Sequence, residues 1–456
     1  MPAGEIIKNR TQLQTSPLRR KTLDIIEAGI KQVLPDTLMQ TALAFRPSTR
    51  SLLVKGDEYI LNGRIFAIGG GKAAGLMAET MEQIIGVANI EAGLVIDKAS
   101  PEEFNTHKIQ VRQAGHPLPD ARGENAVNEI LLLKKQYTIT GGDLILSLIS
   151  GGASSLMPFP IEGVYLEDKL QVTRLLLSCG ADIHQINTVR KHLSGIKGGR
   201  LAQYFAPAAV ISFILSDVIG NDLSVIASGL TCPDPSTYSE AWEVLETYGI
   251  LNKVPRNVIA ILQKGCRGEI PETPKSLNNV HNYIIGDVEM ALQAMAQIAR
   301  DRGFNPLIVS SQQVGNTDDV ARQRAREILD ARYEGYDALL IGGETTPVLP
   351  DKHGKGGRNQ QYAARTLPLL EDYPGDWVLA CVGTDGSDYI PDVAGAIVDK
   401  KSLQDIKAQD PDFQTKLDAY DSNTLLGYAG NSLVITGNTH TNVGDIIVYL
   451  LQAGSM

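Results

Sequence analysis

The chain has 456 residues, which is too many for one ordinary hydrophobic core, so we expect two domains. Its 43% hydrophobic and 21% charged residues are typical of a globular protein. The net charge of -10 argues against nucleic acid or an anionic membrane as a partner. Small molecules are therefore the expected ligands, and an anion site would need a local cluster of Lys and Arg.

The cysteines and the apolar runs indicate the expected cellular compartment. The four cysteines fit neither a zinc motif nor a disulfide framework, which favours a reducing cytoplasm. The first residues lack the pattern of a signal peptide, and no apolar run is long enough for a membrane span. We therefore expect a cytoplasmic protein with no membrane partner. The sequence leaves open whether it forms a homo-oligomer.

In chain order, residues 17–34 show the spacing of an amphipathic helix. A hairpin is expected over residues 52–68, with its turn at Asn62 and Gly63. Apolar strands then alternate with helical segments, which predicts parallel sheets covered by helices. The expected strands are residues 65–68, 93–96, 144–149, 210–215, 283–285, 307–309, 338–341, 377–382 and 432–435.

The alternation breaks between Lys264 and Val280, where Gly, Pro and charged residues accumulate without periodicity. This break predicts a first domain over residues 1–270 and a second over residues 280–456. The alternative is a long surface loop inside one domain.

Polar, Gly-rich segments follow six of the expected strands. Ligands of parallel α/β sheets bind beyond the carboxyl ends of the strands, so these segments are candidates for one site. They are residues 69–72, 150–155, 216–222, 342–346, 383–388 and 436–439. Each could also be a plain helix-capping turn. Because they occur in both halves of the chain, we predict an active site in a cleft between the domains.

Two further segments carry cations without acids. Residues 354–360, GKGGRNQ, combine three glycines with Lys355 and Arg358, and residues 190–200, RKHLSGIKGGR, hold four Lys or Arg. Glycines and cations together suit a phosphate or a carboxylate. A solvated turn and a solvated basic face are the alternatives.

Three carboxylates, those of Asp217, Glu344 and Asp385, follow expected strands. One or two carboxylates with substrate phosphates usually hold Mg²⁺, and a carboxylate can also accept the proton of an attacking hydroxyl. The histidines lack metal-ligand spacing, and a structural role is expected for His116, His184, His192 and His440.

A dinucleotide-binding pattern competes with phosphoryl transfer. Gly69-x-Gly71-x-x-Ala74 follows an expected strand and Asp97 ends the next, which predicts an NAD(P)-dependent reductase. That hypothesis leaves the second half of the chain unused, and Lys72 is unusual in such a turn. A kinase would use the cations and carboxylates of both halves. A non-catalytic binder of phosphorylated metabolites would need only the cations.

Ten segments, taken in order from about residue 20 to 450, carry a family resemblance. They are IGGGKAAGLMAE (68–79), AGHPLPD (114–120), LISGGASSLMPFP (148–160), INTVRKHLSGIKGGRLA (186–202), SDVIGNDLSVIASGLTCPDPST (216–237), GGETT (342–346), GKGGRNQQ (354–361), GTDGSD (383–388), AGAIVD (394–399) and TGNTHTNVGD (436–445). The set resembles the glycerate 2-kinase family, whose C-terminal part is called the MOFRL domain. Members of this family have often been labelled hydroxypyruvate reductase.

The resemblance implies an α/β protein of two domains: an N-terminal Rossmann-like, doubly wound sheet and a C-terminal α/β domain of the MOFRL type, with the active site in the cleft. It implies phosphorylation of D-glycerate to 2-phosphoglycerate with ATP and Mg²⁺. The alternatives are an NAD(P)-dependent hydroxypyruvate reductase, or a kinase for a related small hydroxy acid.

The expected site residues follow from the motifs and the resemblance together. The expected catalytic residues are Lys72, Arg358 and Asp385. The expected substrate-binding residues are Ser150, Gly151, Gly152, Arg190 and Lys197. The expected nucleotide-binding residues are Gly69, Gly70, Gly71, Ser154, Asp217, Asn221, Lys355 and Asn359. The expected metal ligands are Glu344 and Asp385.

The chain departs from the family pattern at residues 389–393, at Leu230, at Asn438 and at His440. Because the cations and carboxylates are kept, the resemblance implies that the phosphoryl chemistry is intact. The departures leave D-glycerate or a relative of it as the expected acceptor.

Overall fold

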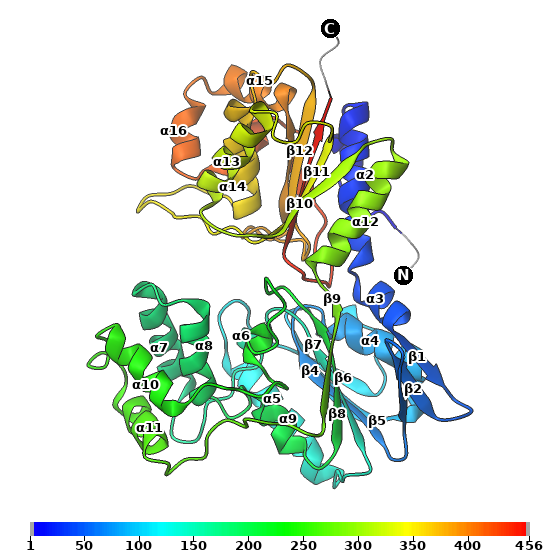
Figure 1. Ribbon diagram of the computed structural model, residues 1–456, viewed down its shortest axis with the longest axis vertical. Coiled ribbons are helices and arrows are strands. Elements are labelled where there is room, and N and C mark those ends of the chain that lie inside the picture. Colours follow the sequence, from blue (N-terminus) through cyan, green and yellow to red (C-terminus); the bar gives the residue numbers. More distant parts are fainter. Residues whose placement is uncertain (1–3, 453–456) are drawn as a thin grey trace. The chain divides into compact units, whose positions relative to one another are not determined.

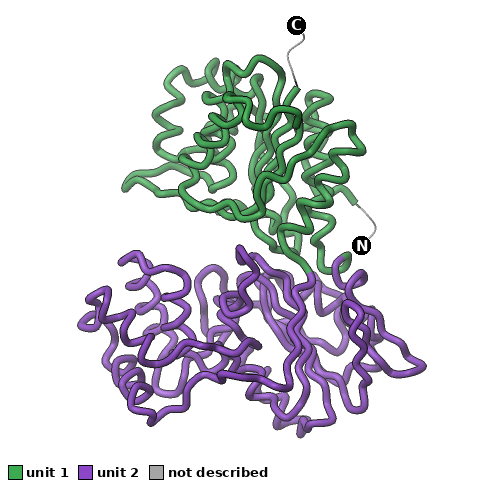
Figure 2. The backbone as a smooth tube through the Cα atoms, in the orientation of Figure 1, with its two compact units in different colours: residues 1–37, 286–456 green, residues 38–285 purple. Residues whose placement is uncertain are grey.

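The structure of the protein, a computed structural model, describes residues 4–452. The chain forms two compact units (Figure 2). Unit 1 comprises residues 1–37 and 286–456, and unit 2 comprises residues 38–285. This division differs from the expected one at both ends, because the first helices join unit 1 and the segment up to Ile285 joins unit 2.

Unit 2 contains a six-stranded sheet in the order β6-β5-β4-β7-β8-β9. Its strands are β4 (Ile65–Gly70), β5 (Ile90–Asp97), β6 (Ile109–Gln113), β7 (Leu144–Ile149), β8 (Ala209–Leu215) and β9 (Val280–Gly286). The pairs β4–β5, β5–β6, β4–β7 and β7–β8 are parallel. The chain starts in the middle and winds outward in both directions, so the doubly wound, Rossmann-like sheet is confirmed.

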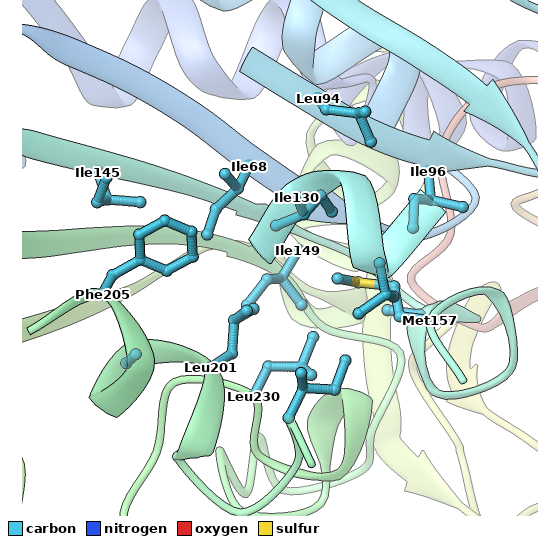
Figure 3. Close-up of a cluster of buried hydrophobic side chains, with 14 of the residues drawn as sticks. Ile68, Leu94, Ile96, Ile130, Ile145, Ile149, Met157, Leu201, Phe205 and Leu230 are labelled. Carbon is cyan, nitrogen blue, oxygen red and sulfur yellow. The ribbon is translucent and has the colours of Figure 1, made fainter. Parts of the chain in front are cut away.

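Helices cover this sheet, and every residue of β4 and β7 is buried. Strand side chains pack against α5 (Ala121–Gln136) and α9 (Arg200–Phe205), while α4 (Ala74–Ile85) packs on β4 and β5. Figure 3 shows this core with Ile68, Leu94, Ile96, Ile130, Ile145, Ile149, Met157, Leu201, Phe205 and Leu230. Continuous apolar strands therefore identified the buried sheet correctly.

A second core of unit 2 lies among four helices that are drawn close together in Figure 1. These are α7 (Leu166–Ser178), α8 (Ile183–His192), α10 (Tyr238–Thr247) and α11 (Arg256–Cys266). The short helix α6 (Ala153–Leu156) leads from β7 towards this group.

The hairpin expected over residues 52–68 is wrong. A small antiparallel sheet of β1 (Leu43–Arg46), β2 (Ser51–Val54) and β3 (Asp57–Ile60) precedes β4. Gly63 lies in the segment between β3 and β4. A Cβ at this position would lie 2.1 Å from Gly142 O. The glycine serves close packing of two loops, and the apolar β4 pairs in the sheet centre instead of folding back.

Unit 1 contains a six-stranded sheet in the order β10-β11-β15-β12-β13-β14. Its strands are β10 (Pro306–Gln313), β11 (Ala338–Gly343), β12 (Trp377–Gly383), β13 (Val393–Asp399), β14 (Leu433–Ile435) and β15 (Asp445–Leu451). Only β10 and β11 pair in parallel, and the other pairs are antiparallel. The expectation of a parallel sheet is wrong here, because β13 and β15 were not expected as strands and both run against β12.

Helices lie on both sides of this sheet (Figure 1). On one side α2 (Pro17–Gln32) and α12 (Val288–Asp301) pack on each other and on the strands. The opposite core is formed with α13 (Thr317–Leu329), α14 (Arg358–Leu369), α15 (Lys400–Gln409), α16 (Phe413–Asp418) and α17 (Ser422–Tyr428). The predicted helix over 17–34 is confirmed as α2, and its packing on β12 and β15 explains why it belongs to unit 1. The helices α1 (Arg10–Leu13) and α3 (Pro35–Ala42) flank it.

Arg19 of α2 ties this N-terminal helix to the rest of unit 1. Its side chain is only 1% exposed, and Nε lies 2.6 Å from Asp399 Oδ2. Its other nitrogens donate to Asn431 O at 2.6 Å and to Ser402 Oγ at 2.8 Å. Removal of this buried cation is costly, because the carboxylate and the other acceptors then remain buried without a partner.

Replacing Arg19 by Met should therefore lower the free energy of unfolding of unit 1 by about 3 to 5 kcal/mol. Thermal and urea unfolding followed by circular dichroism measure this. The matched control is Arg20→Met, since Arg20 is exposed on the same helix. Equal stability of both variants would contradict the assignment of α2 to unit 1.

Candidate active site

In unit 2 the carboxyl ends of three neighbouring strands carry expected site residues. Because β4, β7 and β8 are adjacent and parallel, the segments 69–72, 150–154 and 217–221 that follow them lie along one edge of the sheet. The structure thus brings together the glycine turn with Lys72, the Ser150 loop, and Asp217 with Asn221. In a doubly wound sheet this edge, at the point where the winding reverses, is where ligands bind.

The glycines of the first turn allow it to touch the Ser150 loop. Gly71 has φ +141°, and a Cβ on it would lie 2.1 Å from Ser150 Oγ. The two turns are joined by hydrogen bonds from Lys72 N to Gly151 O at 2.9 Å and from Ser150 N to Gly70 O at 3.2 Å. Ser150 Oγ also accepts from Ala73 N at 3.0 Å. The backbone of both turns is therefore fixed by their mutual contact.

Lys72 and His116 flank Gly152. Gly152 has φ +85°, and a Cβ on it would approach Lys72 Cγ at 3.0 Å and His116 Nε2 at 3.2 Å. Only glycine leaves space for both side chains beside the loop. A purely structural role was expected for His116, but it lies next to the expected catalytic lysine. Its position in the family segment AGHPLPD was the signal in the sequence.

Asp97 does not present the free carboxylate that a dinucleotide fold needs. It is fully buried, Oδ2 accepts from Gly75 N at 2.9 Å, and Oδ1 accepts from Ala99 N at 2.9 Å. Both oxygens thus hold the chain around the start of α4. This use of the acid counts against a ribose contact and against the reductase hypothesis.

Ser154 connects the loop to the cation-rich segment. Its Oγ lies 2.9 Å from Ser228 Oγ, which in turn donates to Asn187 Oδ1 at 3.0 Å. Lys197 Nζ donates to Ser154 O at 3.1 Å. Ala227 and Ser228 have φ +53° and +56°, a conformation that costs non-glycine residues about 1 kcal/mol or more and that gathers at functional sites.

Arg190 and Lys197 add positive charge beside this network. Lys197 is 1% exposed, and burial together with the charges of Arg190 and Lys169 holds its pKa well below the ordinary value. Burial also lowers the pKa of Arg190. Two of the expected substrate-binding residues are therefore neighbours, in an environment that favours an incoming anion.

In unit 1, Arg358 forms the centre of a second group. It begins α14, and its guanidinium binds Asp445 through Nε–Oδ2 at 2.5 Å and Nη2–Oδ1 at 3.1 Å. Nη1 lies 2.5 Å from Glu344 Oε1. Burial opposes its charge, but the carboxylates of Asp445, Glu344 and Asp388 outweigh this and raise the pKa of Arg358. The expected metal ligand Glu344 is thus a partner of the expected catalytic arginine.

Asp445 was missed as a site residue. It begins β15, which runs antiparallel between β11 and β12, so Asp445 pairs with Gly343 on one side and with Gly383 on the other. The first residue of an antiparallel strand thereby reaches the carboxyl ends of its neighbours. An acid directly before the apolar run 446–451 was the available signal.

The glycines of 354–360 have a different cause from the one expected. A Cβ on Gly356 would lie 2.1 Å from Ser422 Oγ, and one on Gly357 would lie 2.0 Å from Asp388 O. The close neighbours of these glycines are therefore protein atoms. These glycines were expected to suit a phosphate or a carboxylate, but in the structure they let the loop dock against α17 and the segment after β12.

The backbone of Lys355 holds this loop in place. Lys355 N donates to Asp421 Oδ1, and Lys355 O accepts from Asn423 N, both at 2.9 Å. The residue itself is exposed. Its expected contact with a nucleotide stays a prediction.

Asp388 organises the first turn of α14. Its Oδ1 accepts from Asn359 N at 3.0 Å and Asn359 Nδ2 at 3.3 Å, and its Oδ2 accepts from Gln360 N at 2.8 Å and Gln360 Nε2 at 3.0 Å. Burial, aided by the charge of Asp445, raises the pKa of Asp388 to about 6, although these hydrogen bonds act in the opposite direction. Asn359 is thus engaged within the protein, and Asp388 was missed as a site residue.

Asp385 lies beside Asp445. Its Oδ1 accepts from Ser387 N at 3.0 Å, and a Cβ on Gly383 would meet Asp385 Oδ1 and Asp445 Oδ1 at 3.4 Å each. Two carboxylate oxygens around one glycine fit the usual protein share of a Mg²⁺ site, which phosphates complete. No group of three or more metal-binding side chains occurs within residues 4–452.

The expected residues therefore fall into two groups. Unit 2 holds Lys72, the Ser150 loop and the cations, and unit 1 holds Arg358, Glu344 and Asp385 with the newly found Asp388 and Asp445. The cleft expected between the domains stays a prediction. None of the helices described by the structure is long and apolar enough to span a membrane.

Comparison with known proteins identifies the relatives of this chain. A family described as a domain of unknown function, DUF4147, matches residues 21–263, and the MOFRL family matches residues 337–445. D-glycerate 2-kinase of Thermotoga maritima is 38% identical over 445 residues, which cover 95% of this chain and 98% of the relative. Glycerate 2-kinase of Pyrococcus horikoshii is 35% identical over 442 residues, which cover 94% and 98%.

A solved structure of glycerate kinase from Thermotoga maritima superimposes with a TM-score of 0.80 at 36% identity, and the match covers 95% of this chain and 99% of that one. Fold and relatives together define the protein as a kinase. The chain belongs to the glycerate 2-kinase family.

The contacts of Asp388 lead to a prediction about the position of Arg358. Asp388→Ala removes the acceptors that hold the first turn of α14, so Arg358 should shift and kcat should fall by on the order of 100-fold. Steady-state kinetics of ATP turnover measure this, and thermal unfolding shows whether the variant is folded. Asp351→Ala, at an exposed position before the loop, is the control. A folded Asp388→Ala variant with unchanged kcat would disprove this role.

Proposed function

We propose that the protein transfers the γ-phosphoryl group of ATP to the 2-hydroxyl of D-glycerate, with Mg²⁺, and releases 2-phosphoglycerate and ADP. The observation that carries the proposal is the near-full-length similarity to proteins named glycerate 2-kinase, together with a buried group of cations in unit 2 that suits a carboxylate. The strand-end turns and the carboxylates around Arg358 fit a nucleotide with its metal.

The groups of this chain suggest a division of roles. Arg190 and Lys197 would bind the carboxylate of the acceptor. Lys72 and Arg358 would stabilise the charge of the transferring phosphoryl group, which is the main task in such a reaction. The 2-hydroxyl oxygen forms a bond to the γ-phosphorus, the bond to the β-γ bridging oxygen breaks, and Asp385 would accept the hydroxyl proton.

The residues of unit 1 fit Mg²⁺ in part. Asp385 and Asp445 place carboxylate oxygens near Gly383. Both oxygens of Asp445 and one oxygen of Glu344 accept from Arg358, so Arg358 would have to release one of them to a metal ion. Three carboxylates surround Arg358, so a divalent cation would offset their charge and allow phosphates to approach. When bound, the metal would orient the phosphates and reduce their charge.

The first test uses the purified protein with ATP, Mg²⁺ and D-glycerate. We expect ADP release, and a phosphorus NMR spectrum of the product should show 2-phosphoglycerate. A parallel assay with NADH and hydroxypyruvate should show no oxidation of NADH, because Asp97 is engaged by the backbone. NADH oxidation in the second assay, together with a lack of ADP release in the first, would refute the proposal. The same ADP assay with other small hydroxy acids tests the alternative acceptors.

The second test removes the proposed charges. Lys72→Met should lower kcat by roughly 100- to 1,000-fold, because one preorganised cation at the phosphoryl group is lost. The control is Lys108→Met, at an exposed position of unit 2. Turnover of Lys72→Met equal to that of the control would exclude Lys72 from catalysis.

For Arg358 the informative change is Arg358→Lys. Alanine would leave Asp445, only 4% exposed, without its partner and would destabilise unit 1. Lysine keeps one charge near Asp445 but cannot form the two-pronged contact, so kcat should fall roughly tenfold or more while the melting temperature stays close to that of the wild type. A large loss of stability with unchanged kcat would assign Arg358 a structural role only.

A further inference from the structure

Lys169 on α7 carries a buried ammonium group without a hydrogen-bond partner. The residue is 8% exposed, and its Nζ contacts no acceptor within residues 4–452. Buried polar groups are nearly always hydrogen-bonded, and a buried charge without a partner is destabilising. An unpartnered ammonium inside a folded protein is therefore a candidate for completion by a ligand.

Two further cations share this environment. Helices α7 and α8, which carry Lys169 and Arg190, pack against each other in one core. The charge of Arg190 acts on Lys169, and the charges of both act on Lys197. Among the residues that the structure describes, no hydrogen bond or ion pair binds the guanidinium of Arg190. Lys197 Nζ donates to the main-chain and side-chain oxygens of Ser154.

The remaining charges around Lys169 do not neutralise the cluster. Glu124 of α5 acts on it with negative charge and Arg200 of α9 with positive charge, but neither forms an ion pair with it. Arg200 itself donates to Ser194 O and Lys191 O. The three cations and the further positive charge of Arg200 outnumber the single carboxylate of Glu124, so the site has a positive potential.

We propose that Lys169 completes, with Arg190 and Lys197, a buried subsite for one small carboxylate, that of the acceptor substrate, and that Lys169 determines the affinity for it. This inference rests on the proposed function. Lys197 connects the subsite through Ser154 to the Ser150 loop and thus to Lys72. A small carboxylate fits a cluster of buried cations, because charge-assisted hydrogen bonds to it satisfy both the anion and the donors.

The protonation of Lys169 makes this subsite sensitive to pH. Burial, followed by the charge of Arg190, lowers the pKa of Lys169 to about 7. Only the protonated form attracts a carboxylate, and the bound carboxylate raises this pKa, so that binding takes up a proton. The KM for the acceptor should therefore be constant below about pH 7 and should rise at higher pH, where the free enzyme loses this proton.

The test is Lys169→Met, which keeps the length of the side chain and removes its charge. At about pH 6.5 the KM for D-glycerate should rise roughly 10- to 100-fold. This is the loss of affinity expected when one hydrogen bond to a charged group is removed. The kcat and the KM for ATP should stay within about twofold, since these depend on other groups. The matched control is Arg174→Met, exposed on the same helix.

The ratio of the two KM values, variant over wild type, separates binding from a structural effect. It should fall towards one as the pH rises to about 9, because Lys169 of the wild type is then neutral. A ratio that is independent of pH, an unchanged KM for D-glycerate, or a raised KM for ATP in its place would overturn the inference.

Thermal unfolding supplies a second readout that does not need turnover. Without ligand, Lys169→Met should melt at a temperature no lower than the wild type, because an unpartnered buried charge is removed. D-glycerate alone should raise the melting temperature of the wild type but not of the variant. If the wild type shows this shift but no ADP release, the proposed function fails and the subsite stands. If the wild type turns over D-glycerate and the variant keeps the shift, the subsite fails and the proposed function stands.

Discussion

The ion pair between Arg358 and Asp445 is the constraint on which the site of unit 1 depends. It exists because β15 runs antiparallel between β11 and β12 and so delivers its first residue to their carboxyl ends. Arg358 is in turn placed by the first turn of α14, which Asp388 holds from the segment after β12. A change of one residue in the register of β15 would move Asp445 to the other face of the sheet and leave Arg358 without its partner.

The two units carry chemistry of opposite charge. In unit 2 the buried groups near the Ser150 loop are cations, and burial, followed by the charge of Arg190, lowers the pKa values of Lys169 and Lys197. In unit 1 the groups around Arg358 are carboxylates, and burial, aided by the charge of Asp445, raises the pKa of Asp388. In the proposed reaction the carboxylate of the substrate would compensate the first group, and a divalent cation would compensate the second. Phosphoryl transfer brings both kinds of ligand into one reaction, whereas hydride transfer has no need for the acids of unit 1.

The sequence predicted what depends on local pattern. Strands such as Leu144–Ile149 were found because a strand buried on both faces is apolar throughout, and the turns after them were found because Gly and Ser follow directly. Features that depend on which strands pair, and in which direction, could not be predicted. The apolar run of β15 is visible, but nothing in it shows that it lies antiparallel in the sheet centre, and so the role of Asp445 was missed. The glycines of 354–360 were found but misinterpreted, since the close neighbours Ser422 and Asp388 are distant in the chain.

Several groups in these sites destabilise the unliganded protein. Lys169 is buried without a partner, Ala227 and Ser228 have left-handed backbone conformations, and Asp388 is a carboxylate whose pKa burial raises. Each of them conflicts with a local rule that the rest of the fold obeys, and such conflicts gather at functional sites. The strain is tolerated because each unit has a large, well-buried core of its own. A carboxylate that accepts a hydrogen bond from Lys169 would remove the cost of burying this ammonium group without a partner. The burial that destabilises the protein without its substrate would therefore strengthen the binding of the substrate.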